Sequence, residues 1–425
     1  MWSCEAVSSY REVLRGNVLI IMLSNVIRQL TLFVTFPFFS LYIRALGGSN
    51  RVIGLVNALR PLSYMFLYPL AGGVADAYGR VKAIVLSGYL GVAIFLLYAL
   101  APDWRFLAAV VLIAGIRVIQ FPASSALLAD SMPREIRGRG YAVVTALPSF
   151  VGILSPFIGG YLISLYGVER AMRLLYILTA IASGVIATIS LRYLRETLPE
   201  RGVINLRRLL IDSYREFIDV VRGLPRDLRL YALMLILSTF SLGLSTPYWV
   251  VYARDVIGLT PYEWGIILTT LSLIYSILTL PAGLIIDRYD RSRIIALCLA
   301  AAIPSIVAFP HSRGFHQTLL IMLPIAVVNA FLSPAAGALM ADMTPREMRG
   351  RVMAALGRGM LIINYRGGGG GGPGMGFFLT IPSILGFLLG GLIYDANPLY
   401  PWLILASAAA VNSALALMLR VRGED

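Results

Sequence analysis

Twelve long apolar runs limit what this chain can fold into. A transmembrane helix needs about 20 mostly apolar residues, and such runs fall at roughly 17–43, 53–75, 83–100, 106–129, 141–166, 173–191, 230–253, 263–286, 293–310, 317–341, 376–395 and 400–420. Apolar residues make up 58% of the chain and charged residues only 14%, whereas soluble domains have about 45–50% and about 25%. The sequence therefore predicts an all-α integral membrane protein with 12 transmembrane helices.

An internal repeat divides these runs into two sets of six. The segment 122–142 returns as 334–354 with 13 of 21 positions identical, and 71–76 returns as 282–287. An even number of spans per repeat inserts both copies the same way up, so the halves are parallel repeats. We expect an N-terminal six-helix bundle over 1–195, a cytoplasmic linker over 196–229 and a C-terminal six-helix bundle over 230–425.

The basic residues predict the orientation. Of the 36 Lys and Arg residues, 26 fall in loops on the side of the N-terminus, seven in loops on the other side and three inside spans. Because basic loops stay in the cytoplasm, both termini are expected there, in a multi-pass protein of the plasma membrane. We expect a monomer.

Two segments depart from the helical pattern. In the linker, apolar residues from Leu206 to Val221 recur at helical spacing, which fits an amphipathic helix on the membrane surface or, equally, a solvated linker helix. A glycine-rich stretch near 357–378 has no counterpart in the first half. It lacks the Lys-Ser/Thr of a phosphate-binding loop, so we expect a flexible cytoplasmic insertion.

Several functional classes fit this sequence poorly. The two Cys and two His residues cannot form a metal site of known spacing, and no cofactor motif is present. The net charge of +14 is spread over short loops rather than gathered on one basic domain, which argues against nucleic-acid binding. No paired catalytic groups lie at one membrane depth, so we do not expect an enzyme.

The loop after the second span carries a motif. Gly72-Gly-Val-Ala-Asp76-Ala-Tyr-Gly79-Arg80 resembles the Gly-x-x-x-Asp-Arg-x-Gly-Arg-Arg motif of the major facilitator superfamily, and Gly283-Leu-Ile-Ile-Asp287-Arg288 lies at the matching place in the second half. The resemblance implies a transporter with alternating access and a cytoplasmic gate of charged helix ends. We assign to that gate Gly72, Asp76, Gly79, Arg80, Asp130, Gly283, Asp287, Arg288 and Asp342. Alternatively, the arginines only set the topology.

Three further motifs resemble the drug:proton antiporter branch of this superfamily. These are Arg117-Val-Ile-Gln120, Ser155-Pro156-Phe-Ile-Gly159-Gly160 and Arg195-Glu196-Thr197-Leu198-Pro199. The resemblance implies an exporter of small organic solutes of the drug-efflux type.

Three arginines lie inside the predicted spans, where a charge is costly unless it faces a polar cavity. Arg28 shares a helical face with Asn25, Arg117 shares one with Gln120, and Arg60 lies in the second span. The matching stripes of the second half are uncharged. The predicted substrate cavity therefore comprises Arg28, Asn25, Arg60, Arg117, Gln120, Ser241, Ser245, Tyr248, Asn329 and Ser333.

These arginines allow two interpretations. They attract an anionic substrate, or they bond carbonyl groups within their own half. An organic-anion carrier is thus an alternative to the exporter, and a non-transporting receptor on the same fold is another. No Asp, Glu or His lies at mid-span, so proton coupling would run through Asp76 or Asp130 at span ends, through the substrate, or not at all.

Overall fold

The computed structural model describes residues 15–133, 135–198, 223–367 and 375–419. Eleven helical stretches in these residues are long and apolar enough to cross a membrane. The remaining predicted span, α4 (Asn50–Tyr78), is 29 residues long but is more polar, because Asn57 and Arg60 lie within it. These stretches together with α4 give the predicted twelve spans. The linker helix predicted within 196–229 falls largely on 199–222, outside the described residues.

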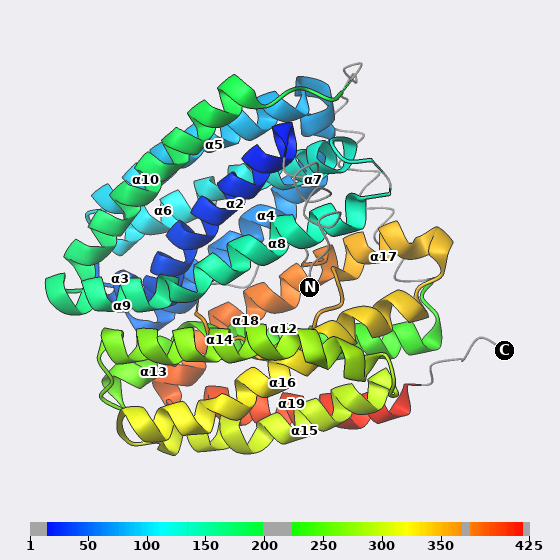
Figure 1. Cartoon of the computed structure of the whole chain (residues 1–425). Coiled ribbons are helices and arrows are strands. Elements are labelled where there is room, and N and C mark those ends of the chain that lie inside the picture. Colours follow the sequence, from blue (N-terminus) through cyan, green and yellow to red (C-terminus); the bar gives the residue numbers. More distant parts are fainter. Residues whose placement is uncertain (1–14, 134, 199–222, 368–374, 420–425) are drawn as a thin grey trace, which may run out of the picture.

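The helices form two bundles, drawn blue to green and green to red in Figure 1. The N-terminal bundle contains α2 (Gly16–Thr35), α3 (Phe39–Ala45), α4, α5 (Arg80–Leu100), α6 (Trp104–Ala114), α7 (Gln120–Asp130), α8 (Arg137–Val151), α9 (Ser155–Tyr166) and α10 (Val168–Tyr193). The C-terminal bundle contains α12 (Arg226–Ser245), α13 (Trp249–Asp255), α14 (Pro261–Ile286), α15 (Arg291–Ala308), α16 (Gly314–Met343), α17 (Arg349–Leu356), α18 (Phe377–Ala396) and α19 (Tyr400–Met418).

Short 3-10 turns interrupt the first and seventh spans at equivalent places. η1 (Phe36–Phe38) joins α2 to α3, and η4 (Thr246–Tyr248) joins α12 to α13. Each turn contains a proline, Pro37 or Pro247, which cannot donate a backbone hydrogen bond and so breaks the α-helical pattern. The shared break shows that the sequence repeat is also a structural one.

Aromatic side chains fill the core of each bundle. Tyr98 and Tyr176 stack with ring centroids 5.1 Å apart in the N-terminal bundle. Trp249 and Trp402, both fully buried, lie 4.6 Å apart in the C-terminal bundle. Aromatic pairs of this kind contribute about 0.5–1.5 kcal/mol beyond the area they bury, and the buried residues around both pairs belong to one continuous hydrophobic core that spans the two halves.

The two halves close against each other at one end of the spans. We call the end where α2 begins and α19 ends the terminal face, and the other end the opposite face. At the opposite face Arg44 pairs with Asp255, and Arg51 Nε lies 3.0 Å from Asp395 Oδ2. Arg44 and Asp255 are 211 positions apart, as the repeat is, so equivalent ends of the first and seventh spans pair directly.

Glycines allow the helix backbones to meet at this face. A Cβ on Gly54 would lie 2.3 Å from the Phe387 carbonyl oxygen, and one on Gly391 would lie 2.6 Å from the Arg51 Cα. A Cβ on Gly160 would lie 2.3 Å from the Pro261 carbonyl oxygen. These contacts join α4 to α18 and α9 to α14 at distances that only glycine permits.

This packing gives a prediction about the opposite face. Gly391→Val should hold it open, because the added side chain would meet backbone rather than a flexible side chain. In a background in which both native cysteines, Cys4 and Cys298, are replaced by Ser, a cysteine at Ser164 should react faster with an impermeant maleimide in Gly391→Val than in the parent. Gly184→Ala is the matched control, since its Cβ would lie 3.5 Å from Val92 in ordinary contact. Equal labelling in all three proteins would contradict the prediction.

Candidate functional site

A cavity of about 300 Å³ lies between the two halves. Its lining comes from the first, fifth and eighth spans and from the segment that follows α17. The polar and charged members of the lining are Gln29, Ser149, Ser272, Tyr275, Ser276 and Arg366. The volume is at the lower end of the range for small-molecule sites, about 300–1,000 Å³, so this cavity is the best candidate for a solute site.

The segment 357–367, at the start of the glycine-rich stretch, forms one wall of this cavity. Leu361, Ile363 and Tyr365 are buried, with 1%, 4% and 2% of their surface exposed. Asn329, near the middle of α16, donates to the Ile363 carbonyl at 3.0 Å and accepts from the Ile363 N–H at 2.9 Å. The Gly367 backbone reaches Pro37 in the first span, where an added Cβ would lie 2.9 Å from the Pro37 carbonyl oxygen.

The expectation of a cytoplasmic insertion is therefore wrong for the described part of this stretch. There are two physical reasons. Apolar Leu361, Ile363 and Tyr365 alternate in the pattern of a buried extended segment and all pack inward. Asn329 also binds both backbone polar groups of Ile363. We call residues 357–367 the inserted segment. Residues 368–374 lie outside the described residues, and Met375 forms a β-bridge with Gly357 where the stretch returns.

Four of the five predicted N-terminal cavity residues come together, without Arg60, but inside their own bundle. Asn25, Arg28, Arg117 and Gln120 line a cavity of about 50 Å³ whose walls come from the first, third, fourth and sixth spans. The second bundle contributes nothing to this lining. The space holds a few water molecules at most and no drug-sized solute.

Each of the three predicted arginines has partners in the N-terminal half. Arg117 Nε donates to the Ser87 carbonyl at 3.3 Å, and its guanidinium lies 4.9 Å from the Phe95 ring centre. Arg28 donates to Asn25 Oδ1 at 2.8 Å. Arg60 lies over the rings of Phe36 and Phe39, at 5.2 and 5.4 Å. This geometry favours the interpretation in which the arginines bond groups within their own half.

The predicted polar residues of the second half are distributed over different roles. Ser241 and Ser245 are buried, and each donates to a carbonyl of its own helix. Tyr248 lies in the opposite-face contact, where its hydroxyl donates to the Asn50 carbonyl at 3.1 Å. Asn329 holds the inserted segment, and Ser333 is buried one turn further along α16. None of these five residues lines the cavity between the halves.

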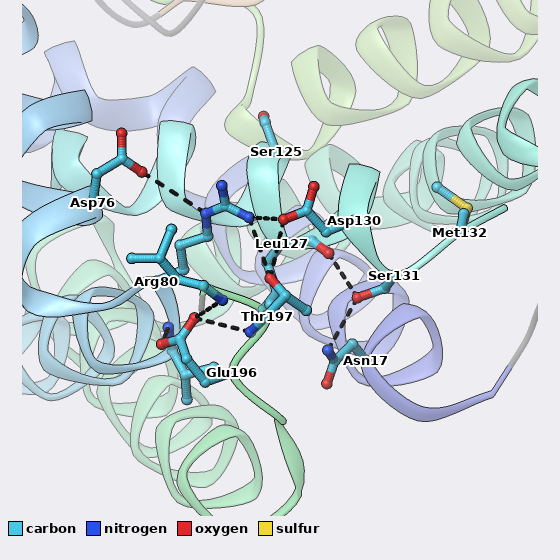
Figure 2. A network of polar contacts seen from close by, with 12 residues as sticks. Asn17, Asp76, Arg80, Ser125, Leu127, Asp130, Ser131, Met132, Glu196 and Thr197 are labelled. Carbon is cyan, nitrogen blue, oxygen red and sulfur yellow. Dashed lines mark hydrogen bonds and ion pairs between the residues drawn. The ribbon is translucent and has the colours of Figure 1, made fainter. Parts of the chain in front are cut away.

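A polar network surrounds Arg80 at the terminal face of the first half (Figure 2). Arg80 is only 13% exposed; it pairs with Asp130, and its Nε lies 3.8 Å from Asp76 Oδ1. Thr197 Oγ1 accepts from Arg80 Nη1 at 3.2 Å and donates to Asp130 at the same distance. The predicted gate residues Asp76, Arg80 and Asp130 thus form one cluster.

The segment that follows the sixth span joins this cluster. Glu196 accepts hydrogen bonds from the backbone N–H groups of Val81 and Thr197, at 3.0 and 3.1 Å. Asn17 exchanges two hydrogen bonds with the Arg195 backbone. The described residues of the motif, 195–198, therefore support the start of α5 at Arg80, and the N-cap Gly79, with φ +97°, has a backbone conformation that favours glycine.

The second half repeats the cluster with a different arginine from the predicted one. Arg291 pairs with Asp342, and its Nη2 lies 3.7 Å from Asp287 Oδ1. Arg288 is exposed and forms no ion pair among the described residues. Arg80 and Arg291 are 211 positions apart, so the repeat itself identifies Arg291 as the counterpart of Arg80. Gly72 and Gly283 have open space around them in their helices.

Asp290 stands where the motif has a glycine, and the structure explains why an acid is suitable there. It is the N-cap of α15 and accepts hydrogen bonds from the backbone N–H groups of Ser292 and Arg293. A hydrogen bond from the Ser292 hydroxyl is the main cause that holds the pKa of Asp290 below its usual value. The charged carboxylate is thus the form that caps the helix.

Sequence reasoning missed the residues that line the cavity between the halves. A signal was present in the eighth span, where Ser272, Tyr275, Ser276 and Thr279 recur at helical spacing. Gln29 lies beside the singled-out Arg28, one position around the helix. No helical pattern could have indicated Arg366, because the segment that carries it is not helical.

The two clusters give a prediction about the arginines at the terminal face. Arg291→Gln should impair transport of a solute as strongly as Arg80→Gln, since each removes the cation shared by two carboxylates. Arg288→Gln is the matched control and should retain most of the wild-type rate. The measurement is initial uptake in proteoliposomes with equal amounts of folded protein. A larger loss in Arg288→Gln than in Arg291→Gln would contradict the prediction.

Comparison with known proteins is consistent with this geometry. The family model described as Major Facilitator Superfamily matches residues 21–360 and 231–425. Multidrug resistance protein 2 of Bacillus subtilis is 23% identical over 96% of each chain, and multidrug resistance protein MdtG of Dickeya zeae is 24% identical over 75% of this chain and 78% of its own.

Solved structures share the fold. A bacterial homologue of the human lysosomal transporter Spinster, inward-facing and occupied, covers 95% of this chain and 97% of its own with a TM-score of 0.69 and 16% identity. The nucleoside transporter NupG covers 95% of this chain and 99% of its own, with a TM-score of 0.69 and 14% identity. The family match spans nearly the whole chain, and the chain belongs to the Major Facilitator Superfamily.

Proposed function

We propose that this chain is a secondary transporter that exports small organic solutes of the drug type by alternating access. The observation that carries the proposal is the arrangement of the halves: they are packed together at the opposite face and enclose a cavity at mid-membrane depth. A carrier that rocks its halves around a central site needs this geometry. The likeness to multidrug resistance proteins over most of the chain supports the drug-type substrate.

The charged clusters support the idea of a gate. Among the described residues, every ion pair at the terminal face stays within one half, whereas two pairs at the opposite face, Arg44–Asp255 and Arg51–Asp395, join the two halves. In this conformation the clusters around Arg80 and Arg291 do not hold the halves together. We infer that they do so in the other conformation, in which the opposite face is open.

The basic residues support a cytoplasmic terminal face in a plasma-membrane carrier. Because Arg366 lies at membrane depth, 25 basic residues remain in loops at the terminal face, against seven at the opposite face. This bias supports cytoplasmic termini, and we infer that the conformation described here is inward-facing. We expect the carrier to work as a monomer.

Coupling to protons would have to use groups outside the cavities. The described lining of the cavity between the halves contains no Asp, Glu or His, and neither does the lining of the cavity around Arg28 and Arg117. The nearest candidates are Asp76 and Asp130, both paired with Arg80. Protonation of Asp130 would weaken its pair with Arg80 and could thereby favour one conformation of the carrier.

The proposal predicts transport by the purified full chain. Proteoliposomes should take up rhodamine 6G, a cationic dye, or fluorescein, an anionic dye on the same ring skeleton, faster than protein-free liposomes. A pH gradient should accelerate uptake severalfold, and Asp130→Asn should remove the acceleration while downhill uptake persists. The measurement is dye fluorescence over time. The proposal fails if neither dye moves faster than in protein-free liposomes.

A further inference from the structure

We propose that Arg366, at the end of the inserted segment, binds the anionic group of the transported solute in the cavity between the halves. The ligand class is an organic anion with a carboxylate or phosphate group. The inference rests on the proposed transport function and names the substrate charge that the chain prefers. It moves the expected cationic site from the N-terminal bundle to a segment that only the second half possesses.

The inserted segment is built to present this residue at a fixed depth. Tyr231 donates to the carbonyl groups of Ala336 and Gly359, which ties the start of the segment to the tenth span. Asn329 binds both polar groups of the Ile363 backbone, and Thr246 donates to the Asn364 carbonyl at 3.2 Å. Asn364 in turn accepts from the Arg366 N–H at 3.1 Å. Asn329 lies in the middle of the tenth span, whereas Tyr231 lies near the terminal-face end of the seventh, so the segment runs from that end toward mid-span.

The cavity offers Arg366 no counter-charge of its own. Arg366 is the sole charged residue among the described residues of the lining, and it forms no ion pair in the described part of the chain. Its guanidinium lies 5.6 Å from the ring centre of Tyr275 in the eighth span. A cation–π contact of this kind orients the group but does not neutralise it.

A cation at mid-membrane depth without a carboxylate favours an anionic ligand. An unpaired arginine is costly there, and a bound anion would lower that cost by pairing with the guanidinium. The planar group suits carboxylate and phosphate because it can donate two parallel hydrogen bonds. Gln29, Ser149 and Ser276 line the same cavity and supply neutral hydrogen-bonding groups from both halves.

The three arginines of the N-terminal half can be compared with Arg366 within the same chain. Arg28 donates to a side-chain amide, Arg117 to a backbone carbonyl, and Arg60 lies over two aromatic rings. None of them lines the cavity between the halves. Arg366 alone among these four arginines lines the central cavity, and it forms no ion pair in the described part of the chain.

The test compares two dyes that differ in charge. Binding of fluorescein and of rhodamine 6G to the purified full chain in detergent is measured by fluorescence anisotropy for wild type, Arg366→Gln, Arg366→Lys and Arg313→Gln. Arg313 is exposed in the loop between the ninth and tenth spans at the opposite face and does not line the cavity, so its substitution controls for the loss of one positive charge. Thermal unfolding followed by tryptophan fluorescence confirms that each variant folds.

The expected result is a loss that is selective for the anion. Arg366→Gln should weaken fluorescein binding by about ten- to a hundredfold, the value of a hydrogen bond to a charged group, and should leave rhodamine 6G binding unchanged or stronger. Arg366→Lys should retain part of the preference for fluorescein over rhodamine 6G, and Arg313→Gln should bind both dyes as wild type does. Asn329→Ala, which releases the inserted segment, should also weaken fluorescein binding.

Two outcomes would overturn the inference. One is wild-type binding of fluorescein by a folded Arg366→Gln variant; the other is an equal loss of both dyes, which would mean a structural role. If wild-type proteoliposomes transport rhodamine 6G and the protein does not bind fluorescein, the transport function stands and the inference alone fails. If neither dye is transported, the proposed function fails as well.

Discussion

Backbone groups inside a bilayer have no water to bond with, and this constraint governs how the cavity between the halves is built. Helices satisfy their own backbone, so a non-helical stretch at membrane depth persists only where protein groups bind it. The inserted segment meets this condition through Asn329, Thr246 and Tyr231. Because these side chains hold the segment, Arg366 and Met360 become wall residues of the cavity, and Asn329 supports the segment instead of lining the cavity.

The repeat made much of the molecule predictable. Spans, the parallel halves and the charged clusters all follow from copies about 211 residues apart, and the structure confirms the fold and the family. The offset of the repeat would also have corrected one residue of the predicted gate. At that offset Arg80 corresponds to Arg291, whereas the local motif pattern pointed to Arg288. The offset was the better guide because two carboxylates, Asp287 and Asp342, must reach one cation, and only the position equivalent to Arg80 lies between them.

Helical phase was a weaker guide to the cavity. It correctly grouped Arg28 with Asn25 and Arg117 with Gln120, but a shared face does not say which neighbour that face meets. Here the face turns toward the third and sixth spans of the same bundle. An arginine can bond a carbonyl or lie over an aromatic ring inside its own bundle, as Arg117 does with Ser87 and Phe95, and such partners belong to other helices whose placement sequence spacing does not reveal. Sequence spacing alone could not distinguish an arginine that faces the central cavity from one that bonds groups inside its own bundle.

The departure from symmetry has a consequence for how the carrier would move. The first half meets the second through glycine contacts at the opposite face, and these can separate as rigid helices. The inserted segment is bound to the second half at Asn329 and Thr246 but also touches Pro37 of the first half at Gly367. Rocking of the halves would therefore break the Gly367 contact while Arg366 stays with the second half. A solute anion bound to Arg366 would travel with that half, and Gln29 and Ser149 of the first half would be the contacts exchanged between the two conformations.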